Sequence, residues 1–205
     1  MVSGICAVIP VKPFRRAKSR LSPVVSKPIR AMLARAMLSR TLDVLAACHL
    51  PLTSCVVSRD MTALDLARRQ GATALAESES GLNAALNQGR EWALARGVQV
   101  VLVLPADLPR LTSGDIMTML ESAHEPRCVI IAPDARGEGT NALLLRPPDA
   151  LNFAFGPHSF YEHCAQAETS QLALHIYRSP TVALDLDTPA DWKRVTALDA
   201  ANFSE

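Results

Sequence analysis

Short apolar runs alternate with helical segments along this chain, and this alternation limits the fold more than any other feature. Four runs are apolar and rich in β-branched residues, which is typical of strands buried on both faces of a parallel sheet. These runs span 4–11, 53–58, 98–105 and 128–133, and two further strands are predicted at 141–147 and 182–187. Helical patterns lie between the first runs at 28–47, 60–70, 81–96 and 112–123. The alternation predicts an α/β fold of three layers, with helices on both faces of a mostly parallel sheet.

Several helix starts can be predicted from short local patterns. The T-x-x-D sequence at 112–115, the S-x-x-E sequence at 159–162 and the T-P-A-D sequence at 188–191 each combine a hydroxyl side chain with an acid three residues later. This spacing is typical of helix N-termini, where the two side chains cap main-chain N–H groups. The stretch 147–160 is the least regular of the chain, and we predict a loop there, close to the site.

Composition and cysteine spacing limit the class of protein. The 205 residues contain no internal repeat, low-complexity tract or linker, so we predict a single domain over 1–205. The five cysteines are scattered without the C-x-x-C spacing of zinc or redox sites, which favours reduced thiols and a cytoplasmic protein. No apolar run reaches the roughly 20 residues that span a bilayer, and the N-terminal charges follow the first apolar run. We therefore expect neither a membrane segment nor a signal peptide.

Positive charge is concentrated directly after the first predicted strand. Nine of the 21 Lys and Arg residues lie in 1–42, a stretch without any acid, although the formal net charge of the chain is only +1. The segment that follows the strand carries five of these cations: Lys12, Arg15, Arg16, Lys18 and Arg20. A solvated surface is the ordinary alternative for such a run. The asymmetry indicates an anionic ligand at this edge of the fold.

Carboxylates are expected at the same edge, because ligands of open α/β sheets bind beyond the carboxyl ends of the strands. Asp107 follows the third apolar run, and Asp185 and Asp187 end the predicted strand at 182–187, on one face of it. Cations suit phosphate groups, and carboxylate oxygens suit Mg2+. The simpler interpretations are a turn at Asp107 and a cap of the last helix by the other two acids. Walker A, G-x-G-x-x-G and G-x-S-x-G patterns are absent, which leaves phosphoryl or nucleotidyl transfer by positioning and a metal.

Five segments together resemble a known family, the phospholactate guanylyltransferases. The family's order and spacing are found in VIPVKPFRRAKSRLSP, LPADLPRLT, APDARGEGTNALLLRPP, FAFGPHSFYEH and LDLDTPADW. The resemblance runs from Val8 to Trp192. It implies a Rossmann-like nucleotidyltransferase fold of the GT-A type and a reaction in the biosynthesis of the deazaflavin coenzyme F-420. The implied reactants are GTP, with Mg2+, and 2-phospho-L-lactate, phosphoenolpyruvate or 3-phospho-D-glycerate.

The resemblance also implies roles for individual residues. Asp107 and one of Asp185 and Asp187 would hold Mg2+, and Lys18 would act with Asp107 in catalysis. The residues implied to contact the phospho-acid are Lys18, Thr140, Gly156 and Ser159. The residues implied to bind the nucleotide are Lys12, Arg15 and Arg20 at the triphosphate, and Gly81, Leu82 and Asn83 on the guanine side.

His158 departs from the family pattern, in which F-G-P-G-S-F has a glycine at this place. Its imidazole would narrow the acid pocket, or donate a hydrogen bond to a hydroxyl or carboxylate of a longer acid. 3-Phospho-D-glycerate carries such a hydroxyl. We therefore count His158 among the acid-binding residues and expect detectable use of 3-phospho-D-glycerate.

Two rival functions are open to this sequence. Another nucleotidyltransferase of the same fold, of the molybdopterin-guanylyl or sugar-nucleotide type, would not need the G-T-N and F-G-P-x-S-F segments that point to a small phospho-acid. A nucleic-acid-binding module would use the basic segment, but a net charge of +1 and 4% aromatic residues argue against it. We expect no nucleic-acid partner and a product that passes to a downstream transferase. The oligomeric state is open, a homodimer included.

Overall fold

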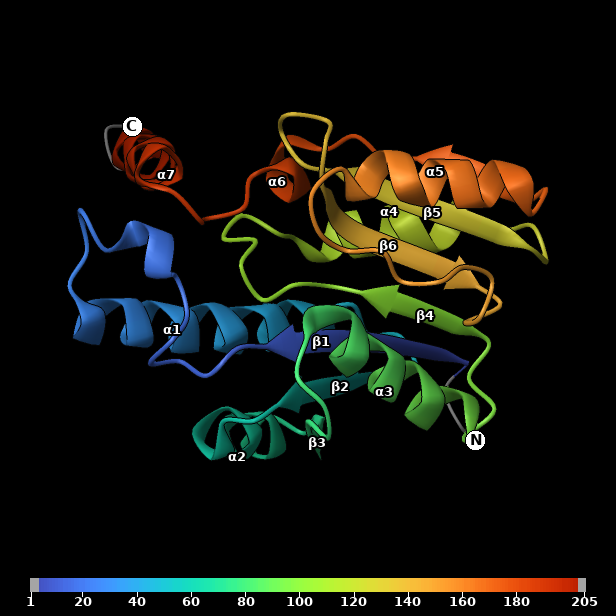
Figure 1. Ribbon diagram of the computed structural model, residues 1–205, viewed down its shortest axis with the longest axis horizontal. Helices are drawn as coiled ribbons and strands as arrows, with labels where there is room; N and C mark the ends of the chain where they lie inside the picture. Colours follow the sequence, from blue (N-terminus) through green and yellow to red (C-terminus); the bar gives the residue numbers. More distant parts are fainter. Residues whose placement is uncertain (1–3, 203–205) are drawn as a thin grey trace.

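A single sheet organises the computed structural model, which describes residues 4–202. Within these residues the strands are β1 (Ile5–Val11), β2 (Leu52–Ser58), β3 (Thr73–Ala76), β4 (Val100–Val103), β5 (Cys128–Pro133), β6 (Thr140–Arg146) and β7 (Ala173–Ile176). Their order across the sheet is β3-β2-β1-β4-β6-β5-β7, and only β6 runs antiparallel to its neighbours. In Figure 1 the arrows of β1 and β4 point to the left, and the arrow of β6 points to the right. The predicted α/β fold with a mostly parallel sheet is confirmed.

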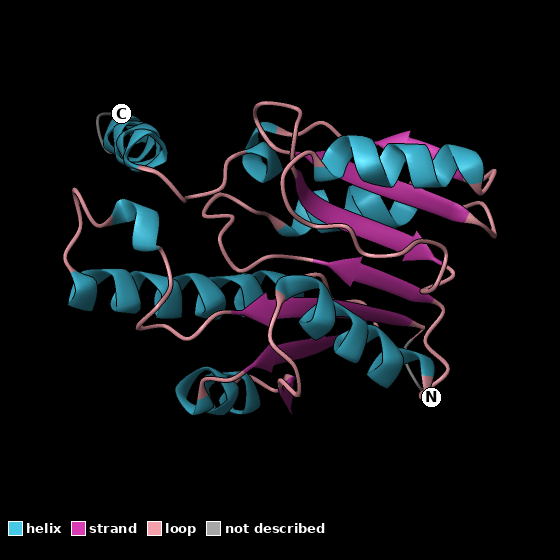
Figure 2. Ribbon diagram, in the orientation of Figure 1, coloured by secondary structure: helices cyan, strands magenta, loops and turns pink. Residues whose placement is uncertain are grey.

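Helices cover both faces of the sheet, as the three-layer prediction requires (Figure 2). The helices that pack on one face are α1 (Lys27–Ala46), α2 (Met61–Arg69), α4 (Ser113–Glu121) and α6 (Pro180–Ala183), and those on the other are α3 (Leu82–Leu94) and α5 (Ser159–Thr169). Alternate residues of β1 divide between the two cores, with Ala7 and Ile9 in one and Cys6 and Val8 in the other. Both faces of the strand are thus buried, which explains why it is apolar throughout. None of the helices in the described part of the chain is long and apolar enough to cross a membrane.

A small third core lies apart from the sheet, at the end of the molecule toward which β1 and β4 point. It joins the short 3-10 turn η1 (Ser19–Leu21), the middle of α1 and the final helix α7 (Pro189–Asn202). Leu21 and Leu186 are almost fully buried in it. Figure 1 shows η1 and α7 together on this side. This core fixes the two segments that carry Lys18 and Asp187.

Helices begin at all three predicted places, and two of the three predicted caps are confirmed. At 112–115 and at 188–191 the hydroxyl and the acid form reciprocal hydrogen bonds with the main chain of the first turn. The capping box predicted at 159–162 is wrong, because His158 is the N-cap of α5. The Ser159 hydroxyl accepts a hydrogen bond from the main-chain N–H of Thr140 at 2.9 Å instead. A contact from another strand has replaced the local cap.

The strand predicted at 182–187 is wrong. Its first residues belong to the short helix α6, whose last two carbonyls accept hydrogen bonds from Asn141 Nδ2 at 2.9 and 3.1 Å. The residues after α6 join no sheet, although Leu184 and Leu186 are buried and the aspartates next to them are half-buried. In an extended segment, alternate side chains are buried when one side of the segment packs against a core. Here Leu184 and Leu186 pack in the third core, and no neighbouring strand is needed.

The sequence prediction omitted the two strands at the sheet edges, β3 and β7. Each has only four residues, and all of these residues are half-buried or exposed. Such short edge strands lack both the length and the continuous apolar pattern of the central strands. Their pairing is decided by the neighbouring strand.

Candidate active site

Lys18 lies at the centre of a charged cluster that joins segments far apart in the sequence. Its ammonium Nζ donates hydrogen bonds to Asp107 Oδ2 at 2.9 Å and to Asp187 Oδ1 at 3.1 Å. The Lys18 side chain is only 7% exposed. Burial alone would lower the pKa of Lys18, but the charges and hydrogen bonds of both carboxylates together outweigh it and raise that pKa. The lysine therefore stays charged, and its ammonium group holds the carboxylates of Asp107 and Asp187 close together.

The main chain of Lys18 is held in the left-handed region, at φ 55 and ψ 36. This conformation costs a residue with a Cβ roughly 1–2 kcal/mol, so surrounding contacts must enforce it. Leu21, fully buried in the third core, donates its main-chain N–H to the Lys18 carbonyl at 3.0 Å. At Lys18 the basic segment is therefore a fixed part of the structure and not a solvated surface.

Asp185 is the third carboxylate of this group, and we call Lys18, Asp107, Asp185 and Asp187 the charged cluster. Burial first, and then the negative charges of Asp107 and Asp187, raise the pKa of Asp185 to about 6. Neither Asp185 nor Asp187 caps the last helix, because the T-P-A-D residues at 188–191 cap it themselves. Negative charge at this place is thus only partly balanced by Lys18.

The charged cluster suits a hard divalent cation in the chemistry of its donors. Burial is the main cause of the raised pKa of Asp185, and repulsion by Asp107 and Asp187 adds to it; a bound cation would relieve that repulsion. Mg2+ usually takes one or two carboxylates and completes its coordination with phosphate oxygens and water. Among residues 4–202 no three His, Cys, Asp or Glu side chains surround a common point as a complete protein cage. A metal held by these carboxylates would therefore need further ligands from outside the protein.

The other cations predicted at the triphosphate are exposed. Arg20 Nη1 lies 3.5 Å from Asp187 Oδ2, so Arg20 reaches the charged cluster, while 74% of its side chain is open to solvent. Lys12 and Arg15 are exposed in the segment between β1 and η1. These side chains differ from Lys18, which is buried and doubly paired.

A second group, Thr140, Ser159 and His163, is buried and carries no charged side-chain partner; we call it the neutral cluster. The three residues are 7%, 2% and 0% exposed. Thr140 N donates to Ser159 Oγ at 2.9 Å, and Thr140 Oγ1 lies 3.0 Å from His163 Nδ1. Burial lowers the pKa of His163 to about 4. The structure thus brings together the start of β6 and the first turns of α5.

The loop that leads into α5 contains two exposed residues with positive φ. Gly156 has a φ of 151 and His158 a φ of 59. The loop predicted over 147–160 extends to His158, which is the N-cap of α5 and makes no side-chain cap. A left-handed φ favours glycine, which accounts for the glycine of the family pattern at this place. Ser159 N donates to Gly156 O at 3.2 Å, so this N–H of the helix start is already bonded.

The antiparallel direction of β6 brings the neutral cluster to the edge that carries the carboxylates. Val103, the last residue of β4, pairs with Leu143, so the start of β6 lies past the end of β4. Asn141 holds the main chain of α6, and Leu186 N donates to Asp107 O at 3.0 Å. Hydrogen bonds therefore connect the start of β6 to both carboxylate segments.

The loop predicted on the guanine side opens α3 and is tied to the loop before α5. Gly81 has a φ of 132 and Leu82 is 40% exposed. Asn83 Nδ2 donates to Phe155 O at 3.1 Å, and Phe155 N donates to Asn83 Oδ1 at 2.9 Å. The Asn83 amide is therefore engaged with the main chain in this structure, and it clamps the loop that carries Gly156.

The sequence analysis assigned no function to His163, since a single histidine in a helix is ordinarily a core or surface residue. One signal was available. Ser159 and His163 are four residues apart, so they lie on the same face of α5. A polar pair on the buried face of a helix beside a predicted ligand contact indicates a hydrogen-bonded group.

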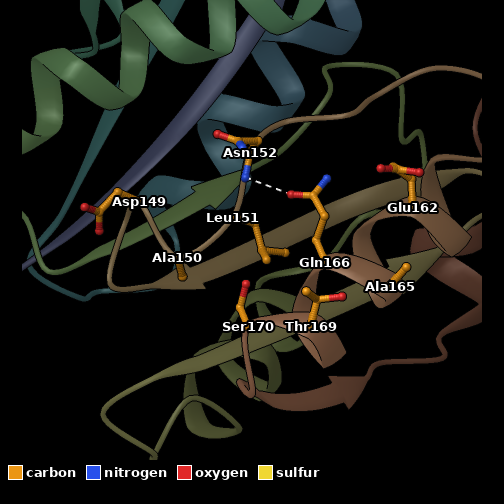
Figure 3. A pocket seen from close by; sticks show the side chains of 9 residues that line it. All are labelled: Asp149, Ala150, Leu151, Asn152, Glu162, Ala165, Gln166, Thr169 and Ser170. Atoms are coloured by element: carbon orange, nitrogen blue, oxygen red, sulfur yellow. Dashed lines mark hydrogen bonds between the residues drawn. The ribbon is translucent and has the colours of Figure 1, made fainter.

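A shallow groove on another part of the surface has a different character. It lies between the 149–152 loop and α5, with Asp149, Glu162 and Gln166 in its lining (Figure 3). Gln166 Oε1 accepts a hydrogen bond from Asn152 N at 3.0 Å. The lining contains acids and neither Lys nor Arg, so it does not suit an anionic ligand.

Comparison with known proteins identifies the family of the chain. Residues 5–198 match the family model described as "Guanylyl transferase CofC like". A phosphoenolpyruvate guanylyltransferase of Rubrobacter xylanophilus is 45% identical over 200 residues, which cover 98% of this chain and 97% of the relative. A 2-phospho-L-lactate guanylyltransferase of Methanothermobacter thermautotrophicus is 36% identical, with coverages of 91% and 81%. A 3-phospho-D-glycerate guanylyltransferase of Colwellia psychrerythraea is 32% identical, with coverages of 94% and 91%.

Solved structures share the fold at low sequence identity. A protein from Desulfovibrio desulfuricans G20, described as a nucleotide-diphospho-sugar transferase, has a TM-score of 0.75 at 19% identity and covers 94% of this chain and 86% of its own. A nucleotidyl transferase from Methanothermobacter thermautotrophicus has a TM-score of 0.67 at 15% identity, with coverages of 93% and 95%. These likenesses show that the sheet and its helices form a nucleotidyltransferase fold, as predicted.

Proposed function

The chain belongs to the CofC-like guanylyl transferase family, and on that premise we propose that it transfers GMP from GTP to the phosphate of a three-carbon phospho-acid in F-420 biosynthesis. The observation that carries the proposal is the buried Lys18 ammonium between Asp107 and Asp187, held by a left-handed backbone. A charged lysine fixed beside partly unbalanced carboxylates suits a reaction between two phosphate groups. The rival nucleotidyltransferase functions share the fold with this chain, whereas the relatives at 32–45% identity are named for phospho-acids.

In the proposed reaction a phosphate oxygen of the acid attacks the α-phosphorus of GTP. The bond from this phosphorus to the β-bridging oxygen breaks, and pyrophosphate leaves. The acceptor phosphate is already ionised at neutral pH, so the protein need not remove a proton from it. Two anions must approach each other, which makes charge neutralisation and orientation the main contributions of the protein. Lys18 supplies a fixed positive charge, and the exposed Arg20, Lys12 and Arg15 would neutralise the triphosphate.

Asp107 and Asp187 are the residues proposed to hold Mg2+, with Asp185 beside them. When bound, the metal would neutralise charge on the phosphate oxygens. Asp107 and Asp187 already face one point, where Lys18 bonds both of them. Lys18 would keep them oriented while the substrates exchange.

The acid subsite is proposed at the neutral cluster and the 156–159 loop. Thr140 and Ser159 are hydroxyl residues buried side by side, and Gly156 gives the main chain close access to a ligand. Two relatives that match at 45% and 41% identity over at least 90% of this chain are named phosphoenolpyruvate guanylyltransferases. We therefore propose phosphoenolpyruvate as the preferred acid, with detectable use of 3-phospho-D-glycerate as predicted from His158.

The test is an assay of pyrophosphate release with GTP, Mg2+ and each of the three acids in turn. We expect the highest kcat/KM with phosphoenolpyruvate, and no release when the acid, GTP or Mg2+ is omitted. Mass spectrometry of the product should show GMP joined to the acid phosphate. Release with a sugar phosphate, and with none of the three acids, would overturn the proposal.

A further inference from the structure

His163 is completely buried on the inner face of α5, where a charged imidazole would be costly. The ring of Phe155 packs against it edge-on, with 5.0 Å between the ring centres. The low pKa that burial gives His163 agrees with a neutral ring throughout the physiological range. A neutral imidazole has one nitrogen that donates and one that accepts a hydrogen bond. The structure determines which is which.

The main-chain N–H of Ala154 donates to His163 Nε2 at 3.1 Å. A main-chain N–H can only donate, so Nε2 must carry the lone pair of the ring. The ring proton then lies on Nδ1. This assignment follows from the fixed chemistry of the peptide group.

His163 Nδ1 lies 3.0 Å from Thr140 Oγ1, so its proton points at that oxygen. The Thr140 hydroxyl accepts this hydrogen bond, and its own proton must point elsewhere. Among residues 4–202 His163 is the only side chain bonded to Thr140 Oγ1. Ser159 Oγ in turn accepts from Thr140 N, and so its hydroxyl proton is likewise left for another acceptor. Two adjacent hydroxyls are thus biased toward donation.

We propose that His163 is a positioning residue whose Nδ1–H tautomer makes Thr140 a hydrogen-bond donor to an oxyanion of the phospho-acid. This inference rests on the proposed function, because that function places the acid at Thr140. An imidazole with its proton on Nε2 would leave Nδ1 as an acceptor, and the Thr140 hydroxyl would then donate into the protein. The Ala154 main-chain N–H bonds Nε2 and so excludes that arrangement. Through His163 it also connects the loop before α5 to the Thr140 hydroxyl.

The tautomer can be tested without substrate, by 15N NMR of the whole protein labelled at histidine nitrogens. We expect one protonated ring nitrogen in His163, at Nδ1, and an unprotonated Nε2, unchanged between pH 6 and pH 8. A proton on Nε2, or a doubly protonated ring, would overturn the inference. Because this measurement requires neither GTP nor acid, it is independent of the proposed function.

The role in acid binding is tested with Thr140→Val, which removes the hydroxyl but keeps the shape, and with His163→Asn and His163→Gln. The Asn amide nitrogen can take the place of Nδ1, whereas the longer Gln side chain places its amide near Nε2. We expect Thr140→Val to raise the KM for phosphoenolpyruvate about tenfold with the KM for GTP unchanged. His163→Gln should raise the acid KM several-fold, and His163→Asn should recover most of that loss.

The double variant separates positioning from general structural support. If His163 acts through Thr140, His163→Gln should raise the acid KM no further in the Thr140→Val background. Equal effects of His163→Gln in both backgrounds, or equal changes in both KM values, would overturn the inference. Thermal unfolding identifies any variant that does not fold, and the NMR result on the unaltered protein then decides. An Nδ1–H tautomer with no activity toward any acid would refute the proposed function and with it the ligand role of Thr140.

Discussion

The charged cluster and the neutral cluster lie at the same edge of the sheet but are built on opposite principles. In the charged cluster Lys18 is buried, but its carboxylate partners Asp107 and Asp187 are partly open to solvent. A left-handed backbone at Lys18 and a small separate core hold this cluster. Thr140, Ser159 and His163 are buried, and short side-chain hydrogen bonds fix their orientation. Charge acts over distance and tolerates small displacements, whereas a hydroxyl proton must point in one direction. In the proposed reaction, the charged cluster would balance the charge of the triphosphate and the neutral cluster would select the small acid.

The largest effect is expected from removing a carboxylate of the charged cluster. Asp107→Asn should reduce turnover to background while the fold is kept, because a neutral amide is a poor ligand for Mg2+ and no longer balances Lys18. Pyrophosphate release and circular dichroism measure the two properties. Asp65→Asn, which alters an exposed acid paired with Arg68, is the matched control.

A comparison of Asp185→Asn with Asp187→Asn sharpens the same assignment. The Asp187 carboxylate shares Lys18 with Asp107, so we expect Asp187→Asn to cost more activity. Near-normal turnover of Asp107→Asn would contradict the metal role proposed for the charged cluster.

The next effect concerns Asp115, whose hydrogen bonds hold the segment 177–181 that leads into α6. Its carboxylate accepts from Thr112 N at 2.9 Å, Tyr177 OH at 2.9 Å, Ser179 Oγ at 2.7 Å and Thr181 Oγ1 at 2.7 Å. Burial alone would raise the pKa of Asp115, but these hydrogen bonds lower it below the ordinary value. Asp115→Asn should therefore lower the free energy of unfolding at pH 7 by about 3 kcal/mol.

The sign of the pH dependence follows from the lowered pKa. Asp115 stabilises the fold above its unfolded pKa of about 3.9, and this contribution is lost as the pH falls through the lower folded value. Urea unfolding should therefore show a large difference between Asp115→Asn and the unaltered protein at pH 7 and a smaller one at pH 3. An equal difference at both pH values would show that the carboxylate charge is not what matters.

Lys18→Ala is expected to have a somewhat smaller effect. It tests whether Lys18 contributes to the binding of both GTP and the acid. Loss of a charge-assisted phosphate contact should cost about 1.5–3 kcal/mol, or roughly 10- to 150-fold in kcat/KM. The KM for the acid should rise at least as much as that for GTP. Arg20→Ala, which removes an exposed cation that reaches the charged cluster, should weaken the binding of GTP more than the binding of the acid. If both variants changed only the KM for GTP, Lys18 would not contact the acid.

The smallest effect is expected at His158, the N-cap of α5 in the 156–159 loop. His158→Gly should raise the free energy of unfolding by about 1 kcal/mol, because glycine adopts a φ of 59 without strain. The same change should shift the kcat/KM ratio toward phosphoenolpyruvate and away from 3-phospho-D-glycerate by roughly tenfold. Competition between the acids measures this ratio. An unchanged ratio together with a gain in stability would show that the imidazole points away from the acid.

Much of the fold and part of the site can be predicted from the sequence because their signals are local. The continuous apolar runs at 4–11 and 128–133 are sufficient to indicate strands buried on both faces. The capping pairs at 112–115 and 188–191 act within one helical turn, and they are confirmed. Lys18 and Asp107 could be expected at one edge because the carboxyl ends of parallel strands meet there.

Tertiary structure decided whatever depends on partners distant in the sequence. The Ser159 hydroxyl is bonded to β6 and not to its own helix, and the amide of Asn83 is taken up by Phe155, 72 residues away. The aspartates at 185 and 187 alternate with buried leucines without a strand, because the third core supplies the apolar surface. The ring proton of His163 lies on Nδ1 because the Ala154 N–H donates to Nε2 on the opposite side of the ring. A side chain's residue type limits which hydrogen bonds it can form, but the packed chain selects the partner and hence the direction of each proton.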